Sequence, residues 1–104
     1  GPMFFGAADK IPYIGDKGPR RVLILPMRAV PALDITALNG LRRLWEECGR
    51  SGIQVIFSHV NEQPLSVFRR SGLYDQAGAE NFVPNIDAAL ERAAELASGA
   101  EVGA

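Results

Sequence analysis

The sequence predicts a single α/β domain with a mostly parallel central sheet and helices packed on it. Residues 21–26 contain the apolar run Val22–Leu25, whose lack of alternation is typical of a strand buried on both faces, and residues 53–58 form a second, β-branched run of strand length. Between them, residues 34–49 carry apolar side chains at helical spacing, and a helix of this length suits a parallel crossover. Because 104 residues suffice for one hydrophobic core, we expect one domain over residues 1–104.

The chain before residue 20 is interpreted as a short strand followed by an irregular connection. Residues 2–6 form an apolar run with Gly and Pro at its ends, and we expect a strand there. The Pro and Gly residues between positions 12 and 19 exclude a long helix in the connection. In the next strand, at residues 21–26, Pro26 should mark the end or a bulge, since proline cannot donate to a ladder.

The helix predicted over residues 34–49 begins at Asp34. Its carboxylate can accept hydrogen bonds from the unpaired backbone N–H groups of the first turn, and it lies at the positive end of the helix dipole. Gly49 and Gly52 mark the end of the helix. The apolar stripe that should face the sheet consists of Ile35, Leu38, Leu41, Leu44, Trp45 and Cys48.

A second helix is predicted over residues 64–71, after the strand at 53–58 and a polar loop. Pro64 suits its first turn, because proline is favoured where a backbone N–H has no helical partner. Gly72 follows its last turn. Residues 73–78 are interpreted as a connection.

A short third strand is predicted at residues 80–83, and the final helix over residues 86–97. Pro84 should end the strand, and Asn85 is placed to cap the helix. The inward face of this helix is expected to consist of Ile86, Ala89, Leu90, Ala93, Leu96 and Ala97.

Charge and composition restrict the class of protein. Eleven basic and twelve acidic residues give a net charge of −1, which does not indicate a nucleic-acid partner or an anionic membrane surface. No run approaches the roughly 18 apolar residues that cross a bilayer. Cys48 is the only cysteine of the sequence, so an intrachain disulfide is excluded, and its position on an apolar stripe predicts burial.

Few residues in the sequence indicate catalysis. His59 is the only histidine and has no Cys, Asp or second His at metal-ligand spacing. Glu46 and Glu47 are adjacent on a helix and therefore point apart. The sequence contains no Walker, dinucleotide-binding or nucleophile-elbow motif. We therefore predict no catalytic residue, no metal site and no cofactor.

The loops after the parallel strands are expected to share one edge of the sheet. The helix start at Asp34 belongs to this region, where free N–H groups and the dipole could hold an anion or a phosphorylated side chain. A plain helix cap is the alternative, and the residues alone favour it. We expect an interaction rim at this edge, formed by Met27, Arg28, Pro31, Ser58, His59 and Asn61.

Several blocks of sequence point to a known family. The blocks are GPMFFGAAD at residues 1–9, VLILPMR at 22–28, VPALDITAL at 30–38, CGRSGIQVIF at 48–57, FRRSGL at 68–73 and NFVPNIDAAL at 81–90. In this order they resemble the STAS domain, the module shared by sulfate transporters and anti-sigma factor antagonists. The first and third blocks are most similar to the cytoplasmic C-terminal domain of SulP-type sulfate permeases.

The resemblance also identifies the equivalent of a phosphoacceptor loop. Anti-sigma factor antagonists carry Asp-Ser-Ser/Thr-Gly at the helix start, with the first Ser as the phosphoacceptor. The matching residues here are Asp34, Ile35, Thr36 and Ala37. Ile35 has no hydroxyl group, so the resemblance leaves only Thr36 as a hydroxyl-bearing residue at this position.

The resemblance implies a non-enzymatic regulatory and protein-interaction domain of a sulfate or other anion transporter, at the cytoplasmic face of the bacterial inner membrane. The implied partners are the transmembrane domain of the parent transporter, a cytosolic regulatory protein and a second copy in a homodimer. It further implies that the family's first strand is missing from residues 1–104, so that a neighbouring molecule pairs with the free edge. Two alternatives stay open: a free-standing antagonist that binds an anti-sigma kinase through the same rim, and a small α/β enzyme that uses His59.

Overall fold

The computed structural model describes residues 21–98. The strand predicted at residues 2–6, the connection after it and the free sheet edge proposed there lie outside the described residues. The described elements are β1 (Arg21–Pro26), α2 (Ile35–Arg50), β2 (Ile53–Ser58), α3 (Glu62–Ser71), α4 (Leu73–Ala77), the 3-10 helix η1 (Ala79–Asn81), β3 (Phe82–Val83) and α5 (Ile86–Ser98).

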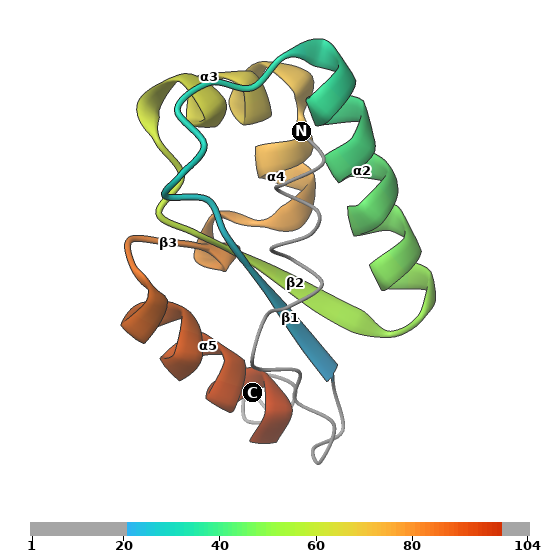
Figure 1. Cartoon of the computed structure of the whole chain (residues 1–104). Coiled ribbons are helices and arrows are strands. Elements are labelled where there is room, and N and C mark those ends of the chain that lie inside the picture. Colours follow the sequence, from blue (N-terminus) through green and yellow to red (C-terminus); the bar gives the residue numbers. More distant parts are fainter. Residues whose placement is uncertain (1–20, 99–104) are drawn as a thin grey trace.

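The described strands form one parallel sheet in the order β1-β2-β3 (Figure 1). In the β1–β2 pair the register runs from Arg21 opposite Ile53 to Pro26 opposite Ser58. Backbone hydrogen bonds continue beyond the strand ends: the N–H of Met27 donates to the carbonyl of Ser58 at 2.8 Å. Because the strands are parallel, their carboxyl ends share one edge, as the sequence predicted.

Helices cover both faces of the sheet, which explains why β1 and β2 show no alternation (Figure 1). On one face, α2, α3 and α4 form the larger part of the core, whose buried residues are Leu25, Met27, Leu33, Leu38, Leu41, Cys48, Val55, Phe57, Phe68, Leu73 and Ala77. On the other face, α5 packs on the sheet through a smaller cluster that consists of Val22, Ile24, Ile56, Ala89, Ala93 and Leu96.

The inward stripe predicted for α2 is confirmed along most of the helix. Leu38, Leu41 and Cys48 are buried, while Leu44 and Trp45 are partly buried against the same cluster. Ile35 is 67% exposed, so its predicted inward position was wrong. At about 100° per residue it lies roughly 120° around the helix from Leu41, outside the face that meets the sheet.

Residues 73–78 were predicted as a connection, and this prediction was wrong because they contain α4. Leu73 is fully buried and Ala77 is nearly so. Gly72 adopts a left-handed conformation with φ 87°, which allows the sharp turn between α3 and α4. A helix of five residues is too short to show a readable period in the sequence. The third predicted strand is confined to Phe82–Val83, because the residues before it form η1.

The predicted cap of α5 is confirmed, since the side-chain oxygen of Asn85 accepts from the N–H of Ala88 at 2.8 Å. The inward face of α5 is narrower than predicted and consists of Ala89, Ala93 and Leu96. Ile86 and Leu90 were assigned to this face wrongly, for they are 46% and 43% exposed. Alanine at the contact lets the helix approach the sheet closely, which leaves no space for larger side chains beside it.

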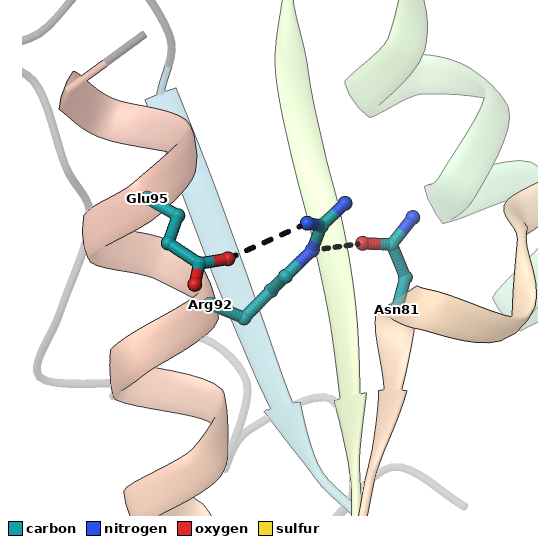
Figure 2. A network of polar contacts seen from close by, with 3 residues as sticks. All are labelled: Asn81, Arg92 and Glu95. Carbon is teal, nitrogen blue, oxygen red and sulfur yellow. Dashed lines mark hydrogen bonds and ion pairs between the residues drawn. The ribbon is translucent and has the colours of Figure 1, made fainter. Parts of the chain in front are cut away.

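A polar network joins α5 to η1 (Figure 2). Nε of Arg92 donates to Oδ1 of Asn81 at 3.1 Å, and the guanidinium lies 3.6 Å from the carboxylate of Glu95. Nδ2 of Asn81, a residue only 3% exposed, donates to the carbonyl of Ala77 at 2.7 Å. The network therefore satisfies a buried amide and fixes α5 against the segment that leads into β3.

The packing of α2 generates the first prediction. Leu41→Ala should lower the free energy of unfolding by about 2–5 kcal/mol, because it removes a fully buried side chain and leaves a cavity. Urea denaturation of the 104-residue chain measures the change. Ile35→Ala is the matched control, since the exposed side chain should be worth no more than about 0.5 kcal/mol. Equal losses in the two variants would contradict the assignment of the buried face.

Candidate interaction site at the carboxyl edge of the sheet

Residues 27–34 connect β1 to α2 and cross from the carboxyl edge of the sheet past α3 (Figure 1). Two amide side chains at the start of α3 hold this loop. Nδ2 of Asn61 donates to the carbonyl of Arg28 at 3.0 Å and to that of Val30 at 2.9 Å. The loop is therefore shaped by groups that lie about thirty residues further along the chain.

Gln63 holds the second half of the loop. Its Oε1 accepts from the N–H of Leu33 at 2.7 Å, and its Nε2 donates to the carbonyl of the same residue at 3.4 Å. One side chain thus pairs with both backbone groups of Leu33, as a neighbouring strand would. Leu33 itself is buried in the larger core cluster, so the loop is held from two sides.

The start of α2 follows directly on this loop. Oδ1 of Asp34 accepts from the N–H of Ala37 at 2.8 Å, which confirms the predicted cap. The carboxylate accepts a hydrogen bond from one of the free N–H groups. It also brings a negative charge to the amino-terminal end of the helix, where it competes with any anion. The geometry therefore corresponds to a capped helix. Ile35 and Thr36 follow it, and both are exposed.

The predicted rim residues differ in their exposure. Met27 and Ser58 are buried, so they contribute to this edge through their backbone. Asn61 is partly buried and engaged with the loop. Five of the exposed residues at this edge are called the rim from here on: Arg28, Pro31, Ile35, Thr36 and His59.

His59 lies where β2 ends, and its backbone is strained. Its φ of 54° is the only positive value at a non-glycine residue within the described part of the chain. Its N–H donates to the carbonyl of Val83 at 2.9 Å, which ties this turn to β3. Such a conformation costs about 1–3 kcal/mol and persists only where the surrounding structure fixes it.

His59 borders two surface hollows. One, of about 520 Å³, lies beside Tyr74 and Phe82, and the other, of about 460 Å³, lies beside Pro26 and Ile86. Within residues 21–98, no group of three or more His, Cys, Asp and Glu side chains could hold a metal ion.

Two residues that line the first hollow, Tyr74 and Phe82, belong to an aromatic cluster. The ring of Phe82 stacks on Phe57 with centroids 4.7 Å apart and also contacts Tyr74 at 4.7 Å. The guanidinium of Arg69 lies 5.0 Å from the centroid of the Tyr74 ring. The ring contacts join β2, β3 and α4 at the carboxyl edge.

Cys48 lies away from this edge, on the buried side of α2. Burial raises the pKa of its thiol, and the neighbouring carboxylate of Glu47 raises it further. The reactive thiolate form is therefore disfavoured, in agreement with the structural role predicted from the sequence.

The clamp formed by Asn61 and Gln63 was not recognised in the sequence. Asn61 was predicted at the rim only because it follows a strand, and Gln63 was not singled out. The available signal was two amide residues at the start of a helix, two positions apart, and such a pair does not identify its partners. The partner carbonyls and N–H group lie in a loop that only the tertiary structure brings near.

The clamp generates the second prediction. Gln63→Ala should speed hydrogen exchange at the amide of Leu33 and lower the free energy of unfolding by about 0.5–1.5 kcal/mol, the usual value of a hydrogen bond. Amide exchange followed by NMR measures the first effect. Gln76→Ala is the control, because it removes a side-chain hydrogen bond to Arg42 elsewhere in the molecule. Unchanged exchange at Leu33 in the Gln63 variant would rule out the clamp.

None of the helices in the part of the chain that the structure describes has the length and hydrophobicity to cross a membrane.

Comparison with known proteins identifies the family. The chain is 32% identical over 69 residues to probable sulfate transporter 4.2 of Arabidopsis thaliana. The aligned residues make up 66% of this chain but only 10% of that protein. The crystal structure of a sulfate transporter family protein from Wolinella succinogenes matches with a TM-score of 0.71 and 34% identity, over 92% of this chain and 80% of that one. Since the model of the STAS domain matches residues 1–89, the chain belongs to the STAS domain family.

Proposed function

We propose that this chain is a regulatory and protein-interaction domain of a transporter for sulfate or a related anion, at the cytoplasmic face of a bacterial inner membrane. The observation that carries the proposal is the likeness to a sulfate transporter family protein over 92% of the chain, at 34% identity. The Arabidopsis relative, a probable sulfate transporter, supports the same assignment. The chain spans about a tenth of that relative, so the transport itself would belong to other parts of a parent protein.

The rim is the surface that we assign to this function. Its loop is held in one shape by Asn61 and Gln63, so little conformational entropy would be lost when a partner binds. Pro31, Ala32 and Ile35 place three exposed apolar side chains within five residues, next to the start of α2. Exposed apolar groups on a rigid support favour contact with another protein.

The residue after Asp34 distinguishes this proposal from a phosphorylation switch. Ile35 stands where the resemblance to anti-sigma factor antagonists would require a phosphoacceptor serine, and isoleucine cannot accept a phosphoryl group. An isoleucine that is 67% exposed can instead be buried by a partner. Thr36 is exposed and carries a hydroxyl, and for this reason the antagonist function is retained as the second candidate.

The partners follow from this assignment. The first is the transmembrane domain of the same parent protein, the second a cytosolic regulatory protein, and the third another copy of the domain. We assign apolar contact at the rim to all three, because Pro31, Ala32 and Ile35 are exposed together at this edge.

The third prediction concerns transport. In cells that produce the parent protein, Ile35→Glu should lower sulfate uptake several-fold at unchanged protein level, because a carboxylate at the centre of an apolar contact is costly to bury. Uptake of labelled sulfate into such cells measures the effect. The control is Ser66→Glu, which introduces the same charge at an exposed residue of α3 outside the rim.

The complete reading frame is the first check on this proposal. Transmembrane segments encoded in the same protein would agree with it, whereas a frame that contains only this domain would overturn it. Incorporation of phosphate at Thr36 by a partner kinase, together with normal uptake in the Ile35→Glu variant, would favour the antagonist function.

A further inference from the structure

Helix α5 exposes its largest apolar side chains. In the described part of the chain, the large apolar residues that are exposed are Ile35, Ile86 and Leu90, and two of these lie one turn apart on α5. Ala94 continues the row by another turn and is exposed as well. We call Ile86, Leu90 and Ala94 the α5 stripe. Its members are spaced by four residues and therefore follow one side of the helix.

The α5 stripe is apolar surface that the core of residues 21–98 leaves unused. The helix contacts the sheet through Ala89, Ala93 and Leu96, so the stripe lies beside this contact rather than in it. Burial of an isoleucine or leucine side chain removes apolar surface from water and is therefore favourable. A partner that covers the α5 stripe would gain binding free energy from each of the two side chains.

An acidic row runs beside the α5 stripe. Asp87, Glu91 and Glu95 are exposed and are also spaced by four residues, each one position after a member of the stripe. The single basic residue of the helix, Arg92, is engaged away from it: its side chain is 12% exposed and donates to Asn81 (Figure 2). Arg92 also lies 3.6 Å from Glu95, which leaves Asp87 and Glu91 as the carboxylates with the most effect at the stripe.

The charge restricts what can cover the stripe. Two copies that met antiparallel through their α5 stripes, around a two-fold axis perpendicular to the helices, would bring two acidic rows together, which Coulomb repulsion disfavours. An anionic bilayer would be repelled by the same row. A segment with lysine or arginine beside its apolar residues would instead be attracted along the whole row.

The hollow beside Ile86 indicates which way such a segment would lie along α5. This hollow of about 460 Å³ is also lined by Pro26, Arg28 and His59, and so it continues the stripe to the carboxyl edge of the sheet. Because Arg28 lines the hollow, the electrostatic potential there is more positive than along the acidic row. The basic residues of a partner should therefore lie against Asp87 and Glu91, and an apolar side chain should enter the hollow.

We propose that the α5 stripe and its acidic row form a docking surface for a basic amphipathic segment of a partner protein, with apolar residues at helical spacing. This surface lies on the face of the sheet opposite α2 and α3 (Figure 1). Its end at the hollow shares Arg28 and His59 with the rim, but Leu90 and Glu91, which the test below changes, lie outside the rim. The two proposals can therefore fail independently of each other.

The test uses the 104-residue chain labelled with ¹⁵N and a synthetic peptide of leucine and lysine, about 18 residues long so that it can be helical when bound. In NMR titrations, chemical-shift changes should concentrate on residues 86–95. Leu90→Ser and Glu91→Lys should each weaken binding about tenfold, which corresponds to the loss of one good contact. Ile35→Ser, the control, should bind the peptide as the unchanged chain does. Circular dichroism verifies that each variant is folded.

Four results would overturn this proposal. The first is equal binding of a peptide in which glutamate replaces lysine, and the second is binding that neither α5 variant weakens. The third is a concentration-dependent dimer in sedimentation that Leu90→Ser abolishes, since the occupant would then be a second copy. The fourth is binding to phosphatidylglycerol vesicles that depends on Leu90, which would assign the stripe to a membrane.

Discussion

The parallel pairing of β1 with β2 determines where the other parts of the domain lie. The register from Arg21–Ile53 to Pro26–Ser58 brings both carboxyl ends to one edge and requires a crossover, which α2 provides on one face. The opposite face is left to α5. The loop of residues 27–34 must then leave the carboxyl edge and pass α3 to reach the start of α2. The candidate site is a consequence of this path.

A loop with such a path needs partners for its backbone. Asn61 and Gln63 supply them from the first turn of α3, and Leu33 anchors the loop in the core. Asp34 then completes the first turn of α2, so that Ile35 and Thr36 project from a fixed base. This order of support explains how a domain can present exposed apolar residues without losing its shape. A rigid surface of this kind is suited to binding another protein.

The sequence predicted those features whose signals are local. The two long strands were recognisable as largely apolar, β-branched runs, α2 by its period, and the caps at Asp34 and Asn85 by an oxygen-bearing side chain before an apolar pattern. It did not predict α4, which is too short to show a period. Nor could it assign Ile35, Ile86 and Leu90 correctly, because periodicity marks apolar residues without revealing which of them the sheet contacts. On α5 the contact is made mainly by alanines. The contacts of Asn61 and Gln63 join distant segments and leave no pattern in the sequence.

We propose that the rim contacts the membrane-embedded part of the same parent protein, the first of the three partners considered. It is tested most directly by a photoreactive amino acid placed at position 35 of that protein in intact membranes, with position 66 as the control site. We expect light to link position 35, but not position 66, to a transmembrane segment, as identified by mass spectrometry of the joined peptides. Crosslinks from position 35 that lead only to a soluble kinase or anti-sigma factor would contradict it.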